Sequence, residues 1–252
     1  MSGNRLIQSF LEKRVKFCQN LMGIGSASSA SSSGEFSVFK LLKTKLEEPF
    51  CIFDVGANKG QFLGLALDKL GDRDFSIHCF EPSKETFSKL LSSCEDNRVV
   101  KNNFGMGKKK EEAVLHYDES GSGLASLTKR DLLHFGIEFD KSETVKINTI
   151  DIYCAENNIE RIDLLKMDVE GHELDVLQGA LDVFKEKTIS AVMFEFGGCN
   201  IDTRTFFKDF WDFFSSRNYK LFRITPSGYL LPITNYSERY EQFVTTNYLA
   251  LK

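Results

Sequence analysis

The sequence predicts an α/β fold with one mostly parallel sheet of seven strands and helices on both faces. From about residue 35 onward, apolar runs of strand length alternate with segments whose apolar residues recur at helical spacing. The first run also ends in an acid and a glycine-bearing turn, which is typical of a strand that leads into a ligand-binding turn. The 252 residues suffice for one large domain with a full core.

The first strand is predicted at 50–55, because this short apolar run has aromatic and β-branched residues and no helical period. The helix after its turn is predicted at 61–70. The other strands are predicted at 75–80, 98–102, 162–168, 189–196, 219–224 and 243–251, and the other helices at 83–92, 149–157, 172–185 and 203–217. The last helix carries many phenylalanines at helical spacing, which predicts core packing.

Residues 105–145 interrupt this alternation with a polar, glycine-containing excursion that includes a short strand at 113–117. An insertion beside the sheet edge is suited to form a lid or to select a substrate. Residues 1–25 predict an amphipathic helix, which either caps the domain or docks onto a partner. The serine-rich stretch 26–34 predicts a flexible linker, so the domain is expected to span 35–252.

Composition excludes several classes of protein. The net charge of -4 and the pI near 5.7 argue against a nucleic-acid backbone as the main partner. The six cysteines show no C-x-x-C pair and no short metal spacing, which favours reduced thiols and a cytoplasmic location. No long apolar stretch follows the first residues, so we expect neither a secretory signal nor a membrane span.

The turn Asp54-Val55-Gly56-Ala57-Asn58-Lys59-Gly60 predicts a cofactor site, because glycines let the backbone approach a ligand closely. A nicotinamide-binding turn requires glycines where this chain has Gly56, Asn58 and Gln61, so that fingerprint fails at two positions. A tight turn without a ligand is the other reading of this segment.

A second acid, Glu81, ends the strand predicted at 75–80, and Pro82 stops the strand from continuing. In open α/β sheets, ligands bind beyond the carboxyl ends of the strands, where an acid can accept hydrogen bonds from a ribose diol. Glu81 is therefore the predicted ribose ligand. The alternative is a solvated glutamate ahead of a helix that Ser83 caps.

Four motifs in chain order resemble the FkbM-type methyltransferases, over about residues 48–252. They are the Asp54 turn, Phe80-Glu81-Pro82, the segment Asp168-Val169-Glu170-Gly171-His172-Glu173 with Leu177-Gln178-Gly179-Ala180 after it, and Asn247-Tyr248-Leu249-Ala250. The resemblance implies a Rossmann-like class I methyltransferase fold. It also implies an S-adenosylmethionine-dependent O-methyltransferase that acts on hydroxyls of sugars, glycans or related natural products, and we expect a carbohydrate hydroxyl.

Under this resemblance, Asp54 and the turn backbone are expected to meet the methionine part of the cofactor, and Glu81 the ribose. Asn103 is expected near the adenine, and Ser126 near the pocket. The cofactor-binding set is therefore Asp54, Gly56, Asn58, Gly60, Glu81, Pro82, Asn103 and Ser126.

Methylation of an alcohol requires a general base or a metal that acidifies the oxygen. Asp168 and Glu195 each end a predicted strand, and His172 begins a predicted helix, so these three residues are the catalytic candidates. Asp168 and Glu195 are also the candidate ligands for Mg or Mn, because both ions prefer oxygen ligands, although the two acids would equally bind substrate hydroxyls. The alternative for His172 is that it packs or bonds locally at the start of the helix. The alternative for Glu170 and Glu173 is that their charges stabilise the helix N-terminus without taking part in chemistry.

Two other functions stay open at this point. A non-catalytic domain that binds adenosylmethionine, or docks onto a partner, fits the N-terminal helix and the serine-rich stretch. An NAD-dependent oxidoreductase fits the strand, turn and acid but lacks the required glycines.

Overall fold

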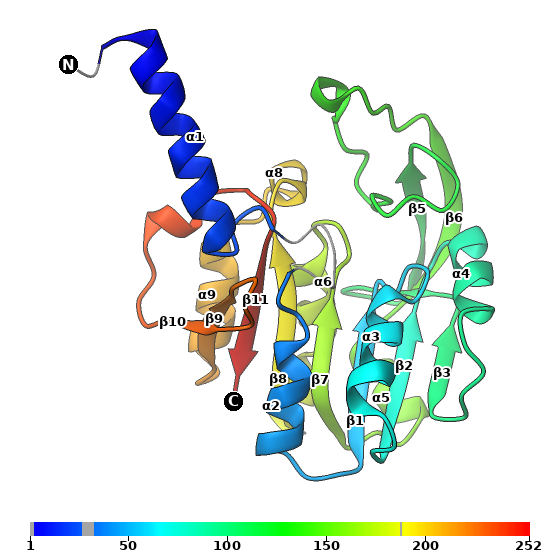
Figure 1. The fold of residues 1–252 in the computed structure, drawn as a ribbon. Coiled ribbons are helices and arrows are strands. Elements are labelled where there is room, and N and C mark those ends of the chain that lie inside the picture. Colours follow the sequence, from blue (N-terminus) through cyan, green and yellow to red (C-terminus); the bar gives the residue numbers. More distant parts are fainter. Residues whose placement is uncertain (1–2, 27–32, 187) are drawn as a thin grey trace.

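The fold is that of a computed structural model, which describes residues 3–26, 33–186 and 188–252. Within these ranges the central sheet has eight strands in the order β10-β9-β11-β8-β7-β1-β2-β3 (Figure 1). They are β1 (Phe50–Val55), β2 (Phe75–Phe80), β3 (Val99–Asn102), β7 (Arg161–Met167), β8 (Thr188–Phe196), β9 (Lys220–Ile224), β10 (Leu230–Ile233) and β11 (Thr246–Leu251). β3, β2, β1, β7 and β8 pair in parallel, whereas β11 is antiparallel to β8 and β9. The predicted α/β fold is confirmed, and all seven predicted strands form.

The eighth strand, β10, was not predicted. It pairs only with β9, antiparallel, at the edge of the sheet. Pro232 lies inside it, and a proline within an apolar run argues against a strand. An edge strand tolerates proline because one side of its backbone needs no partner.

Helices cover both faces of the sheet. α2 (Ser37–Lys45), α3 (Gln61–Leu70) and α4 (Lys84–Leu91) contribute to one apolar cluster with residues of β1 and β2. α5 (Ile150–Glu156), α6 (Glu173–Gln178), α7 (Leu181–Glu186) and α9 (Phe207–Ser215) contribute to the cluster on the other face. Phe207, Phe210 and Phe214 of α9 are buried core residues as predicted, and the Phe210 ring stacks 4.7 Å from that of Phe194. Phe206 just before the helix is instead 49% exposed.

Three helical features differ from the prediction. The helix predicted at 172–185 is split into α6 and α7 at Gly179, where a Cβ would lie 2.0 Å from the Gly107 carbonyl oxygen. The helix predicted at 203–217 forms only as the shorter α9, the helix α8 (Cys199–Thr203) before it was not predicted, and Arg204 between them adopts a left-handed conformation (φ 58°). Helix α2 was missed.

The excursion at 105–145 forms a second sheet in the order β4-β6-β5, from β4 (Gly105–Met106), β5 (Glu111–Tyr117) and β6 (Lys141–Asn148). The strand predicted at 113–117 lies within β5. The long connection from β5 to β6, with the 3-10 turn η1 (Leu133–Phe135), loops over the edge where the parallel strands end (Figure 1).

The N-terminal helix α1 (Arg5–Leu21) projects from the body, and none of its residues is buried (Figure 1). The chain then joins the domain, because Ile24 is buried and forms a β-bridge with Thr246. Residues 27–32 of the predicted linker lie outside the described residues. Ser33 is buried, and Gly34 packs so closely that a Cβ would lie 2.0 Å from the Thr225 carbonyl oxygen.

The register aligns the ends of four central strands. Val55 pairs with Phe80 and Met167, and Met167 pairs with Phe194. The next residues along the chain are Gly56, Glu81, Asp168 and Glu195. The sheet therefore presents three acids and a glycine turn along one edge.

Candidate active site

The turn after β1 is packed tightly against the end of β7. Gly56 has a φ of 76°, and a Cβ at this position would lie 1.9 Å from the Asp168 carbonyl oxygen. The backbone N–H groups of Gly56 and Ala57 both donate to the Phe80 carbonyl at 3.0 Å. No side chain fits at position 56, because the ends of β1 and β7 are in direct backbone contact there. Gly60 (φ 92°) precedes the first residue of α3.

Lys166 in β7 forms the central ion pair of the site. Its ammonium lies 3.0 Å from Asp54 Oδ1 and 3.6 Å from Asp168 Oδ2, and it donates to the Gly56 carbonyl at 3.3 Å. Burial works to lower the pKa of Lys166, but the carboxylates of Asp54 and Asp168 outweigh it and raise this pKa overall. Lys166 is therefore charged. The pKa of Asp54 is raised overall by burial, and the adjacent Lys166 ammonium limits that rise.

Asp54 is fully buried and lines neither of the cavities described below. The structure thus places its carboxylate beneath the turn, against Lys166, rather than in the position expected for contact with the methionine part of a cofactor.

Glu81 faces the first cavity and is held by the backbone. Its carboxylate accepts hydrogen bonds from the N–H groups of Asn58 at 3.0 Å and Ser83 at 2.9 Å. Burial raises the pKa of Glu81 to about 7, although these hydrogen bonds oppose the rise. Each carboxylate oxygen keeps a second lone pair, so Glu81 can still accept from a ligand hydroxyl.

Asn103, expected near the adenine, bonds to the backbone of the turn that carries Glu81. Its amide donates to the carbonyl oxygens of Glu81 at 3.0 Å and Pro82 at 3.2 Å. Asn103 lines neither cavity, whereas Pro82 lines the first. Asn103 therefore holds the turn that carries Glu81 rather than facing a ligand.

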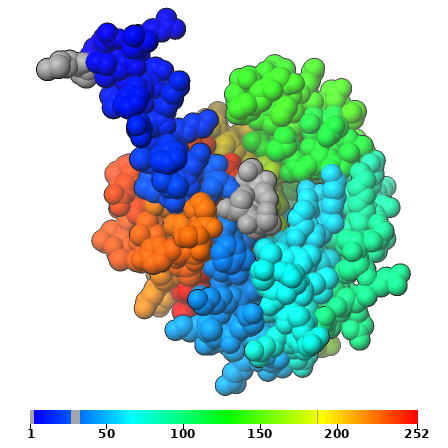
Figure 2. All heavy atoms as spheres, in the orientation of Figure 1, coloured from blue at the N-terminus to red at the C-terminus, as the bar shows by residue number. Residues whose placement is uncertain are grey.

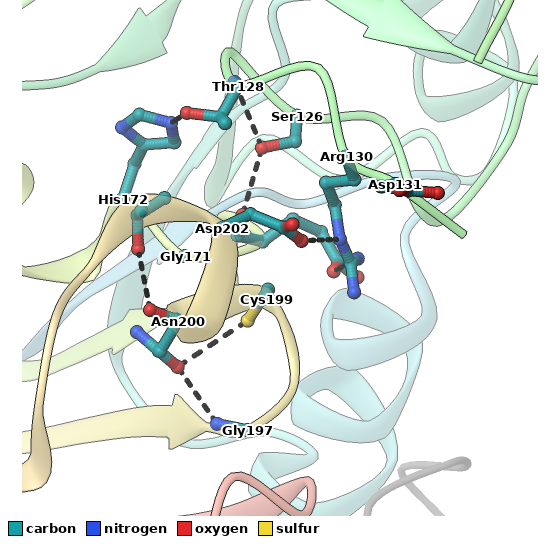
Figure 3. A network of polar contacts seen from close by, with 12 residues as sticks. Ser126, Thr128, Arg130, Asp131, Gly171, His172, Gly197, Cys199, Asn200 and Asp202 are labelled. Atoms are coloured by element: carbon teal, nitrogen blue, oxygen red, sulfur yellow. Dashed lines mark hydrogen bonds and ion pairs between the residues drawn. The ribbon is translucent and has the colours of Figure 1, made fainter. Parts of the chain in front are cut away.

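The turn after β7 is fixed by its own side chains. Glu173 accepts from the N–H groups of Val169 at 3.0 Å and Gly171 at 3.4 Å, and burial raises its pKa to about 7. Glu170 adopts a left-handed conformation (φ 51°) and forms an ion pair with Arg130. Arg130 also contacts Asp202 at 3.3 Å (Figure 3). Glu173 thus stabilises the turn.

Ser126 and His172 connect the excursion to this turn. Ser126 Oγ donates to the Glu170 carbonyl at 2.9 Å, and the Thr128 hydroxyl lies 3.0 Å from His172 Nε2 (Figure 3). His172 Nδ1 lies 2.8 Å from Asp175 Oδ2. In the neutral ring, Nδ1 donates to Asp175 and Nε2 accepts from Thr128, so both nitrogens are engaged.

Two adjoining cavities open at the strand ends. The first is lined by Glu81 and His172, by Ile147 of β6 and by residues of the excursion, such as Met106, Leu115, Ser126 and Leu127. The second is lined by apolar and polar residues together, and its charged residues include Glu35, Arg130, Lys166 and Glu195. Five residues line both cavities: Gly56, Asn58, Gly123, Asp168 and Glu170. The cavities therefore meet between the glycine turn and the turn after β7.

Glu195 lies in the second cavity with no hydrogen bond or ion pair to its side chain among the described residues. Burial raises its pKa well above the usual range, and the nearby charges of Asp168 and Glu170 add to the rise. Glu35 lines the same cavity and is held by Ser33 Oγ at 2.7 Å and Asn247 Nδ2 at 3.1 Å.

The pair Asp168 and Glu195 does not fit a divalent metal. In the part of the chain that the structure describes, no three His, Cys, Asp or Glu side chains are arranged to hold a metal ion. The Lys166 ammonium also lies beside Asp168 and offsets its charge, which leaves less net negative charge than a divalent ion requires. We derive no step through a metal.

The profile of the methyltransferase FkbM domain matches residues 54–221 of this chain. The chain belongs to the FkbM methyltransferase family. A curated relative, the hexuronic acid methyltransferase AglP of Haloferax volcanii, is 27% identical over 151 residues, which cover 58% of this chain and 56% of AglP.

Two solved structures are also similar to the chain. The FkbM methyltransferase from Methylobacillus flagellatus has a TM-score of 0.48 at 14% identity, covering 96% of this chain and 60% of its own. The plantazolicin methyltransferase BpumL, in complex with SAH, has a TM-score of 0.44 at 9% identity, covering 99% of this chain and 91% of its own. The chain thus spans under two thirds of AglP and of the M. flagellatus protein.

Three residues of the site, Lys166, Glu35 and Arg130, were not predicted from the sequence. A lysine inside the apolar strand Ile162-Asp163-Leu164-Leu165-Lys166-Met167 is a signal for a buried ion pair, because a buried lysine needs a partner. Glu35 and Arg130 have no comparable local signal, since Glu35 bonds to the distant Asn247 and Arg130 pairs with the distant Glu170 and Asp202.

We expect Lys166→Met to lower the free energy of unfolding by about 3–5 kcal/mol, because it leaves Asp54 buried without its counter-charge. Adding Asp54→Asn should recover much of that loss. Lys208→Met is the matched control, since its exposed pair with Asp212 contributes under about 1 kcal/mol. Urea unfolding measures all three variants, and a Lys166→Met loss no larger than the control would refute the central ion pair.

The ligand-free protein should become less stable as pH rises from about 6.5 to 8. Native Glu81 and Glu173 have pKa values of about 7, whereas the unfolded acids are already ionised at these pH values. The native state therefore binds more protons, and the free energy of unfolding should fall by about 2 kcal/mol over this range. Urea unfolding at several pH values measures the slope, which should be shallower in Glu81→Gln. A stability that rises over this range contradicts the assignment.

Proposed function

We propose that this chain is an S-adenosylmethionine-dependent O-methyltransferase that methylates a hydroxyl of a sugar or glycan. Family membership supports the reaction class. The observation that carries the proposal is the shared wall of the two cavities, formed by Gly56, Asn58, Gly123, Asp168 and Glu170. A cofactor in the first cavity and an acceptor in the second would meet at that wall.

The residues of the first cavity fit adenosylmethionine. Met106, Leu115 and Ile147 offer apolar surface to a flat base, and Glu81 offers a carboxylate to a ribose. Asn58 Oδ1 is buried and has no hydrogen-bond partner in the described part of the chain, so it is free to accept from a ligand. The bound cofactor would supply a methyl group already activated by a positively charged sulfur.

The carboxylates at the cavity junction suit a cationic ligand. Asp168 is about half exposed there, and Glu170 lies beside it in the same wall. Since Asp54 is fully buried against Lys166, we assign contact with the cofactor's ammonium group to Asp168 instead.

We assign the general base to Glu195. A base must accept the hydroxyl proton, and burial together with the neighbouring carboxylates raises the pKa of Glu195 well above the usual range, which makes its ionised form a stronger proton acceptor. Its carboxylate has no protein partner among the described residues and faces the second cavity. Glu195 would take the proton of the acceptor hydroxyl, and the bound cofactor would supply the methyl group to that oxygen.

His172 is better suited to positioning than to catalysis. It lines the first cavity, and both of its nitrogens are engaged, by Asp175 and by Thr128. Because Thr128 belongs to the excursion, His172 would hold that segment over the cofactor.

A carbohydrate acceptor has two supports. The curated relative AglP carries the name of a hexuronic acid methyltransferase, and a hexuronic acid is a sugar acid. The second cavity is also rich in carboxyl groups, such as those of Glu35 and Glu195, which accept hydrogen bonds from hydroxyl groups.

Glu195→Gln should lower kcat by about 100-fold or more, because the variant cannot take up the hydroxyl proton. The wild-type rate should rise with pH as Glu195 ionises, and the variant should lose that rise. The measurement is transfer of labelled methyl from adenosylmethionine to a panel of sugars and oligosaccharides. Affinity for S-adenosylhomocysteine should be unchanged, since Glu195 lines only the second cavity.

Glu112→Gln, on the exposed face of β5, is the matched control and should leave the rate unchanged. A Glu195→Gln enzyme that keeps its rate and pH profile would refute the base assignment. Binding of S-adenosylhomocysteine without transfer to any sugar would refute the carbohydrate acceptor and favour a different acceptor or a non-catalytic domain.

A further inference from the structure

Helix α1 carries an apolar face that the domain leaves uncovered. With about 100° of rotation per residue, Leu6, Phe10, Phe17 and Leu21 fall on one side of the helix. Their exposed fractions range from 55% to 79%. Figure 2 shows α1 projecting from the body.

The opposite side of α1 faces the domain. Leu11, Val15 and Gln19 border a groove whose other wall includes Ile24 and Val244. The Gln19 amide also donates to Gln242 Oε1 at 3.2 Å. These contacts orient the helix so that its apolar face points away from the protein.

The charge of α1 differs from that of the rest of the chain. The helix contains four basic residues against one acid, Glu12, so its net charge is +3, whereas the whole chain carries -4. The basic residues are Arg5, Lys13, Arg14 and Lys16. The Arg14 guanidinium lies 5.1 Å from the centre of the Phe10 ring, so a cation lies directly beside the apolar face.

We propose that α1 docks the protein onto an anionic phospholipid surface. An amphipathic helix with phenylalanine and leucine on one face and lysine and arginine around it lies in the membrane interface, where anionic headgroups attract its charge. Within the described residues, no helix is long and apolar enough to cross a bilayer, so the contact is with the surface. Pairing of two α1 helices is disfavoured, because it would bring two +3 charges together.

The position of α1 relates this docking to the second cavity. Gly25 and Val244 line both the groove beneath α1 and the second cavity. A protein held through α1 would therefore keep that cavity close to the lipid surface. The docking itself does not depend on the proposed methyl transfer.

The test is co-sedimentation of the full chain with vesicles of pure phosphatidylcholine and with vesicles that also contain phosphatidylglycerol. The partition coefficient should be at least about tenfold higher on the anionic vesicles and should fall as salt is raised. Phe10→Ser with Phe17→Ser should abolish binding, and Lys13→Glu with Lys16→Glu should abolish the preference for anionic lipid. Because α1 buries no residue, these variants should keep the wild-type unfolding temperature.

Phe135→Ser is the matched control, since Phe135 is 71% exposed on η1, away from α1, and its loss should leave binding unchanged. Absence of binding to anionic vesicles at low salt would overturn the proposal. Binding of the α1 variants at the wild-type level would also overturn the proposal. So would a wild-type self-association, measured without vesicles, that the α1 substitutions abolish.

Discussion

The candidate site depends on the buried ammonium of Lys166, held between Asp54 at the end of β1 and Asp168 just after β7. Two acids at neighbouring strand ends would repel each other, and the lysine between them offsets that repulsion. Its hydrogen bond to the Gly56 carbonyl fixes the turn that both cavities share. The same interaction therefore stabilises the sheet edge and shapes the place where ligands would meet.

The acids around this ion pair differ in whether their carboxyl groups are already bonded to the protein. Glu173 and Glu35 already accept hydrogen bonds from the protein, and Glu170 is paired with Arg130. Glu195 has no such partner among the described residues, and burial raises its pKa. An unpaired carboxyl group that lines the second cavity and has a raised pKa is the one suited to exchange a proton with a ligand.

The sequence predicted the features that depend on local pattern. All seven expected strands formed, and the acids that end three of them, Glu81, Asp168 and Glu195, lie along one edge of the sheet because parallel strands end together. Features that depend on distant partners were not predictable. Asp54 turned inward because Lys166 lies across the β1–β7 pairing, and Arg130 reaches Glu170 across a long loop. Backbone packing at Gly179 similarly split a helix whose apolar spacing looked continuous.

The central claim is that this edge of the sheet binds adenosylmethionine. Thermal unfolding of the full chain with S-adenosylhomocysteine, compared with NAD, tests it most directly, because a ligand that binds only the folded protein raises its unfolding temperature. The account predicts a rise of about 5 °C or more at saturating S-adenosylhomocysteine, and no rise with NAD. No shift with S-adenosylhomocysteine, or an equal shift with NAD, would contradict it.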